Sequence, residues 1–147
     1  IWQFFTGKTA IGFLQLSSSY NPLNNKFTVG VIPVSGSNGK FIVFSCICDT
    51  NGTVQSSEIG YCDANNNFAY TVFLDSVIDI NNDLAFSPEH QISGEAMVNT
   101  NSEIICAFTD NYNKPKFINF SEDYSINWNI KKLHYRLPKC VYFNIEK

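Results

Sequence analysis

The chain has 147 residues, of which 44% are hydrophobic and only 16% are charged, where globular proteins average about 25% charged. This length fits one ordinary domain, and no apolar run reaches the roughly 18 residues of a membrane-spanning helix, so we expect no membrane insertion. The net charge of −3 and the acid-rich centre of the chain oppose binding to nucleic acid. The first residue is Ile rather than Met, and we therefore expect a piece of a longer protein.

The first predicted elements are two strands separated by a polar loop. Residues 11–17 (IGFLQLS) are mostly apolar, and residues 26–34 (KFTVGVIPV) are rich in β-branched and aromatic side chains. Pro33 has no N–H to donate, so we expect it at a sheet edge or where a strand ends. Strict alternation would place two sets on opposite faces of the second strand: Phe27, Val29, Val31 and Pro33 on one, and Thr28, Gly30 and Ile32 on the other.

The next predicted strand, residues 40–49 (KFIVFSCICD), lies between two turn signals. SGSNG at 35–39 precedes it and Asn51-Gly52 follows it, and both favour tight hairpins because Gly accepts positive φ angles. The first half of this strand is apolar on both faces, which is typical of a central strand that is covered on both sides. Its period of two directs Cys46 and Cys48 to one face with Phe44, and Ile47 to the other.

Further short strands complete the predicted fold. Turn residues separate them about every 8–15 positions, and no segment has a sustained helical period. The pattern predicts one all-β domain, an antiparallel β-sandwich of about nine or ten short strands. The remaining strand candidates are residues 53–61, 68–80, 91–98, 103–109, 116–120, 124–130 and 140–145.

The five cysteines fit a metal site or a disulfide framework poorly. A structural zinc site needs two ligand pairs, whereas here a single C-x-C pair stands beside isolated cysteines and two isolated histidines. The number of cysteines is odd, and a domain of this size does not need disulfides for stability. We expect reduced cysteines that pack as small apolar groups, while one bridge from Cys46 or Cys48 to Cys106 stays open.

Motifs for catalysis or cofactor binding are incomplete. The chain has no nucleophile elbow and no Cys–His signature, and GSNGK at 36–40 lacks the first Gly and the final Ser or Thr of a phosphate loop. DINND at 79–83 imitates the first ligands of a calcium loop, but the required Gly is missing and His90 replaces the required Glu. We therefore expect no metal, no cofactor and no catalytic residues.

Charge is unevenly distributed along the chain. Residues 41–113 contain ten acidic and no basic residues, whereas seven of the ten Lys and Arg follow from Lys114 onward. The basic last third would dock on the acidic surface, meet it on a neighbouring subunit, or simply form a solvated face. Another reading is a cationic-aromatic patch for an anionic ligand, and its candidate ligand-binding residues are Trp128, Lys131, Lys132 and Arg136. Sugar binding suits a surface with so many aromatic rings and so many Asn, Ser and Thr side chains.

The two ends of the chain resemble the head domain of an adenovirus fibre, in particular a small avian-type fibre. In that family a Thr-Leu-Trp-Thr segment ends the shaft and begins a compact antiparallel β-sandwich, and the protein ends with this head. Here Ile1-Trp2 is followed at once by short β-runs, and the last predicted strand ends within two residues of the terminus, but neither flanking Thr is present. The resemblance implies a shaft or linker end at residues 1–10 and a binding domain at 11–147.

The resemblance also implies a function. Such heads are homotrimers on the virion surface, assembled inside the host cell, and they attach to cell-surface proteins or sialylated glycans; no receptor-binding residue carries over to this sequence. Two other readings remain. One is a cellular, extracellular lectin or adhesin β-sandwich, and the other is a secreted β-barrel enzyme with a Cys–His site that only the fold assembles.

Overall fold

A computed structural model describes residues 25–77, 84–124 and 133–134, and in this part of the chain all regular structure is β apart from one short 3-10 turn. No helix among these residues is long and apolar enough to cross a bilayer. The turn η1 is Ala64–Asn66. The strands are β1 (Asn25–Ser35), β2 (Lys40–Cys48), β3 (Val54–Asp63), β4 (Ala69–Val77), β5 (Ser93–Val98), β6 (Ile104–Thr109) and β7 (Lys116–Asn119).

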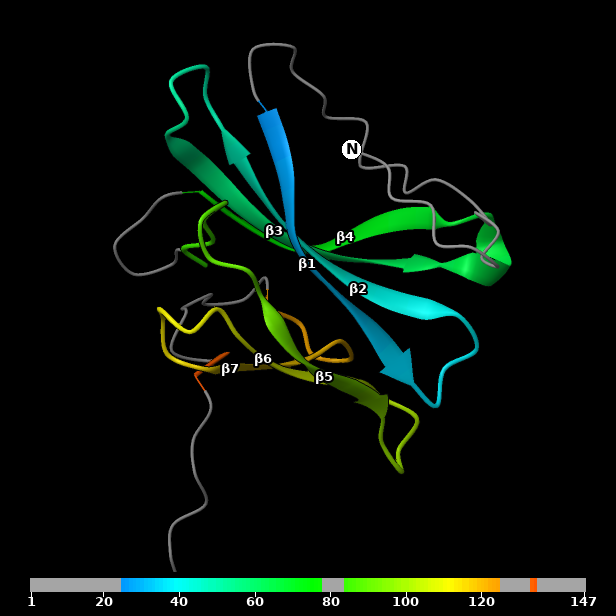
Figure 1. Cartoon of the computed structure of the whole chain (residues 1–147). Helices are drawn as coiled ribbons and strands as arrows, with labels where there is room; N and C mark the ends of the chain where they lie inside the picture. Colours follow the sequence, from blue (N-terminus) through cyan, green and yellow to red (C-terminus); the bar gives the residue numbers. More distant parts are fainter. Residues whose placement is uncertain (1–24, 78–83, 125–132, 135–147) are drawn as a thin grey trace, which may run out of the picture.

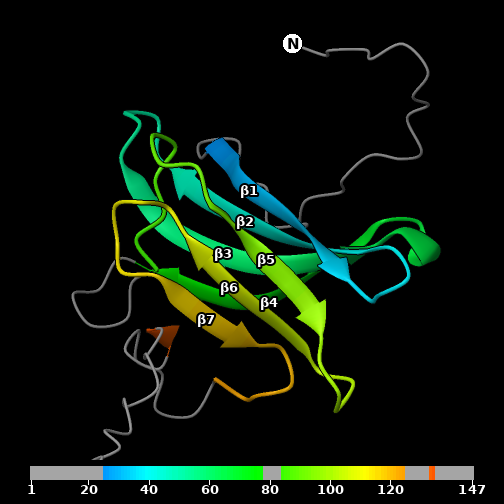
Figure 2. The same ribbon diagram turned by 60° about the horizontal axis from the view of Figure 1, so that its bottom comes forward.

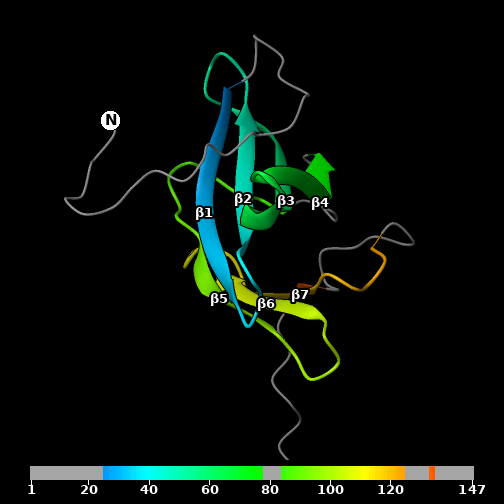
Figure 3. The same ribbon diagram turned by 90° about the vertical axis from the view of Figure 1, so that its right-hand side faces the viewer.

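The seven strands form one mixed, curled sheet in the order β4-β3-β2-β1-β5-β6-β7. β1 to β4 pair as consecutive antiparallel neighbours, and so do β5 to β7. A short parallel contact joins the two groups, in which Val34 and Ser35 of β1 pair with Ala96 and Met97 of β5. Figures 1 and 3 show the β5–β7 group folded under the β1–β4 group, and Figure 2 shows β5, β6 and β7 running side by side in front of the other group.

The predicted hairpin turns are confirmed. Gly36 and Gly39 between β1 and β2 have φ angles of +79° and +85°, and Gly52 between β2 and β3 has +83°. Asp49 holds the second turn, because its Oδ1 accepts hydrogen bonds from the backbone N–H groups of Asn51 and Thr53. Glycine has little steric conflict at positive φ angles and therefore suits these positions. The glycines in SGSNG and in Asn51-Gly52 for this reason predicted both turns from the sequence.

The hydrophobic core lies inside the curl, between the two groups of strands. Phe44 of β2 faces Phe108 of β6 with ring centroids 4.8 Å apart, and Phe86 meets both rings edge-on. At the far ends of the sheet, Phe73 of β4 packs against Phe120, just after β7, at 4.6 Å. The curl therefore brings the side chains of its two edge regions together, although β4 and β7 are not hydrogen-bonded neighbours.

β2 is covered on both faces, as the sequence predicts. Residues 42–46 are all buried, and they include the outward-facing Val43 and Ser45 as well as the core residues. Cys46 and Cys48 lie in the core with Phe44, whereas Ile47 is half-buried on the other face. The prediction for the C-x-C pair is confirmed.

The predicted faces of β1 are wrong. A β-bulge between Thr28 and Gly30 adds one residue to β1, so the alternation reverses beyond it. Val29 is buried, but Val31 and Pro33 are exposed, and Ile32 points into the core instead. Pro33 lies near the end of the strand, as expected, although β1 is a central strand of the sheet rather than an edge.

The all-β class is confirmed, whereas a sandwich of nine or ten strands is not. The β1–β5 contact is parallel, so the sheet is mixed where a purely antiparallel one was expected. The strands expected at 11–17 and 140–145, most of the one at 124–130, and the expected shaft segment at 1–10 lie outside the described residues.

Candidate functional site

The candidate ligand-binding residues from the sequence lie outside the described part of the chain, and so does the imitation calcium loop at 79–83. The cationic-aromatic patch therefore stays a prediction. Its members are Trp128, Lys131, Lys132 and Arg136.

The cysteines of the described residues are buried, reduced thiols. Cys46, Cys48, Cys62 and Cys106 are all free, so no bridge joins Cys46 or Cys48 to Cys106. Burial, followed by the neighbouring Cys48, raises the pKa of Cys46 to about 12. Burial alone raises the pKa of Cys106 to about 12, and burial with the charge of Asp63 raises the pKa of Cys62. A nucleophilic cysteine needs a lowered pKa and access to substrate, so these environments oppose thiolate chemistry.

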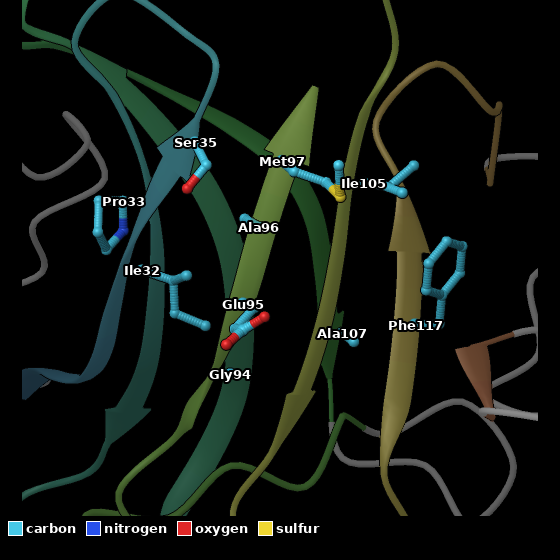
Figure 4. A pocket seen from close by; sticks show the side chains of 10 residues that line it. All are labelled: Ile32, Pro33, Ser35, Gly94, Glu95, Ala96, Met97, Ile105, Ala107 and Phe117. Carbon is cyan, nitrogen blue, oxygen red and sulfur yellow. The ribbon is translucent and has the colours of Figure 1, made fainter. Parts of the chain in front are cut away.

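An exposed apolar surface lies on the outer face of β5, β6 and β7, which we call the outer β5–β7 face. Met97 is 51% exposed and Phe117 36% exposed. Figure 4 shows how the register aligns this face: Glu95, Ala107 and Phe117 follow one another across the three strands, and Met97 lies opposite Ile105. The face consists of Glu95, Met97, Ile105, Ala107 and Phe117.

This face is hollowed. One hollow of about 500 Å³ lies over it and extends to Pro33 and Ser35 of β1. A second, of about 510 Å³, shares Gly94, Glu95 and Ala107 with the first and continues to Pro115 in the loop before β7 and to Lys116 at the start of that strand. The two form a shallow, mostly apolar groove, and Glu95 lies in the part that both hollows share.

A polar cluster occupies the outer face at the other end of the sheet. Glu58 of β3 is only 7% exposed, and its Oε1 accepts hydrogen bonds from Lys26 Nζ of β1 and from the Tyr70 hydroxyl of β4, each at 2.5 Å. The ammonium group of Lys26 also lies 5.1 Å from the centre of the Tyr70 ring. Burial and then Glu58 raise the pKa of Tyr70, so its hydroxyl stays protonated and donates. The hydrogen bonds of this cluster connect β1, β3 and β4.

Two loops meet beside the groove and carry an exposed aromatic pair. Tyr112, in the β6–β7 loop, is 74% exposed, and its ring stacks on His90 with centroids 4.5 Å apart and planes 6° apart. Asn113 Nδ2 donates to the Ala85 carbonyl at 3.3 Å and so connects the two loops. Asp110 holds the turn, because its carboxylate accepts hydrogen bonds from the backbone N–H groups of Tyr112 and Asn113.

The Asp110 carboxyl is well stabilised in its charged form. Burial by itself would raise its pKa, but the hydrogen bonds from Asn113 and from the backbone of Tyr112, together with the positive charge of Lys116, outweigh burial and lower it. His90, one of the two histidines available for a Cys–His site, is engaged with Tyr112. In the described ranges no three His, Cys, Asp or Glu side chains gather as a metal site would require.

The sequence reasoning missed the outer β5–β7 face and the Tyr112–His90 pair. Alternation along the strand predicted at 91–98 already places Glu95 and Met97 on one face, and a Met on the same face as a charged residue was the available signal. No sequence signal joins His90 to Tyr112, because the contact is between two loops.

Comparisons of the chain with protein-family models, curated proteins and solved structures find no match. The fibre-head resemblance thus stays a prediction from the sequence.

Proposed function

We propose that the chain is a non-enzymatic binding domain that assembles as a homotrimer and attaches a virion surface to a cell-surface receptor or glycan, as a viral fibre head does. The outer β5–β7 face carries this proposal. Its exposed Met97 and Phe117 lie in one hollowed surface, and contiguous exposed apolar surface in a globular domain is typical of association sites.

The proposed occupant of this face is another copy of the chain. In a closed trimer each subunit presents one surface to a different surface of the next, so the two sides need complementary charge. Glu95 lies in the face, within a stretch that has ten acids and no basic residue, whereas seven basic residues follow from Lys114. The basic last third of one copy would therefore meet Glu95 on the face of its neighbour.

The proposed sandwich supports the same role. Phe44 and Phe108 already face each other across the curled sheet, as residues of two packed layers do. The strands predicted at 11–17, 124–130 and 140–145 would bring the full chain to the expected nine or ten.

Light scattering coupled to size exclusion tests the assembly. Wild-type protein should elute as one species with about three times the 16.6 kDa mass of the chain. Replacing Met97 by Asp would put a second carboxylate beside Glu95 in the face, so M97D should elute as a folded monomer with an unchanged far-ultraviolet circular dichroism spectrum. The matched control is V72D, which changes an apolar residue that is 38% exposed on β4, away from the face, and should stay trimeric.

Two results would overturn the proposal. A wild-type protein that is monomeric at all micromolar concentrations would exclude a trimer formed by this domain. A fully trimeric M97D would show that the outer β5–β7 face is not the interface.

A second candidate function is a cellular lectin or adhesin domain. The observation that favours it is the exposed Tyr112 ring, which does not depend on assembly. Sugar binding by a stable monomer would support this candidate over the fibre head.

A further inference from the structure

Tyr112 and His90 form a flat aromatic surface at the end of the molecule where the β6–β7 loop meets the segment before β5. One face of the tyrosine ring lies against the imidazole, and the side chain as a whole is 74% exposed, so the opposite ring face is open to solvent. We call this pair the Tyr112 platform. Single exposed aromatic residues are common and need no function, so the platform must be distinguished by its construction.

The platform is held in place from both sides. Asp110 fixes the backbone of Tyr112 and Asn113 through hydrogen bonds of 3.0 and 2.7 Å, and its other oxygen accepts from Asn113 Nδ2 at 2.7 Å. On the other loop, Ser87 holds the turn that presents His90, since its carbonyl accepts from the His90 N–H and its hydroxyl from the Glu89 N–H. The ring is thus oriented before a ligand arrives, and binding to it costs little conformational entropy.

We propose that the Tyr112 platform binds a neutral pyranose sugar, whose C–H face stacks on the open face of the tyrosine ring. The face of an aromatic ring is electron-rich, and the aligned C–H bonds of one face of a pyranose present weakly positive hydrogens to it. Exposed polar side chains close in sequence, namely Glu89, Asn111 and Lys114, supply donors and acceptors for the hydroxyl groups at the sugar edge.

The local charges favour a neutral sugar over a sialylated one. Glu89 and Asp110 are balanced by Lys114 and Lys116, and Lys116 acts on the Asp110 carboxylate. A site for an anionic sugar would need an excess of basic groups, which this loop pair does not have. The inference rests on the proposed binding role and adds to it a ligand class and a place.

Saturation-transfer NMR with the methyl glycosides of galactose, glucose, mannose and N-acetylglucosamine tests the proposal directly. At least one of these should bind the wild type with a dissociation constant on the order of millimolar. Y112A should weaken that binding by at least about tenfold, equivalent to about 1.4 kcal/mol, whereas Y112F, which keeps the flat ring, should bind within about twofold of wild type. H90A should weaken binding by a smaller factor, because the ring loses its support.

The assembly variant M97D separates this proposal from the trimer. M97D should bind the same glycoside as the wild type, because Met97 lies on the sheet face and not in the loop pair. If the wild type is not a trimer but still binds the glycoside, the trimer proposal is wrong and the proposed sugar site at the Tyr112 platform stands. The proposal is overturned if none of the four glycosides binds, if Y112A binds as the wild type does, or if only sialyllactose binds.

Discussion

At the scale of single residues, the missing side chain of Gly60 makes room for the Tyr70 ring. A Cβ atom at Gly60 would come within 2.4 Å of the Tyr70 ring. Because this atom is missing, the ring crosses the outer face of β3 from its register partner Cys62 and reaches Glu58. The fully buried Ser45, opposite Glu58 in the sheet, has no hydrogen-bond partner for its hydroxyl among the described residues.

Asp110 is the residue whose titration should be visible in stability. Its pKa is lowered in the folded protein, so it contributes stability in full above the ordinary carboxyl pKa of 3.8, and this contribution is lost as pH falls from there through the lowered value. Denaturant unfolding of wild type and D110N between about pH 2 and pH 7 should therefore show a wild-type advantage at neutral pH that shrinks in acid.

T50A is the control for this titration, because Thr50 is exposed, does not titrate and lies in a different turn. Its difference from the wild type should be small at every pH. A D110N difference that is as large in acid as at neutral pH would contradict a lowered Asp110 pKa.

At the scale of the elements, β5 and β6 approach each other so closely that one position accepts only glycine. A Cβ atom at Gly94 would lie 2.1 Å from the Ala107 carbonyl oxygen and 2.8 Å from the Phe108 Cα. These are backbone atoms of a paired strand, so they cannot move aside alone. G94A should lower the free energy of unfolding by about 1–3 kcal/mol or more, the usual range for overpacking, as measured by urea unfolding.

The neighbouring substitution S93A is the matched control for G94A. Ser93 is exposed on the same strand, and its replacement should change stability by no more than about 0.5 kcal/mol. Equal stability of G94A and wild type would mean that the strands are further apart than described here.

The elements were predictable where short-range chemistry determines them. The Asn51-Gly52 turn and the core direction of Cys46 and Cys48 follow from local rules of φ angle and strand period. The faces of β1 were not predictable, because the bulge before Gly30 depends on a distant segment. The N–H of Ile92 donates to the Val29 carbonyl at 2.8 Å, and this close approach is possible only beside a glycine.

At the scale of the whole molecule, the curl buries reactive groups from both halves of the sheet in one interior. Cys46 comes from β2 and Cys106 from β6, and both have a pKa near 12, so almost none of either thiol is ionised at pH 8. Ellman's reagent should therefore react slowly with Cys46 and Cys106 in the native protein and at once with at least four thiols in denaturant without reductant.

A variant control makes the thiol count specific. C106A should give one thiol fewer than the wild type in denaturant. Fewer than four thiols in unreduced, unfolded wild type would mean that a disulfide forms. A fast reaction of the native wild type that C106A loses would mean that the interior around Cys106 opens readily.

The candidate sites also depend on the whole molecule, which limits what sequence can predict of them. The strand that contains Met97 can be recognised in the sequence by its alternation. Only the register of β5 with β6 and of β6 with β7 shows that Met97 lies opposite Ile105 and next to the row Glu95, Ala107 and Phe117. His90 and Tyr112 are 22 positions apart in different loops, so no local pattern links them. The composition shows that aromatic residues are abundant, but it does not show which of them lie together in the fold.

The parallel contact between β1 and β5 has a consequence for how the chain folds. Every other strand pair joins neighbours in the sequence, whereas Val34 pairs with Ala96, 62 positions further on. Hairpins form within microseconds, but closing so long a loop must wait until enough contacts repay its entropy. The β1–β4 group and the β5–β7 group should therefore form first. Until β5 pairs with β1, the free edge of β1 can pair with a strand of another newly made chain.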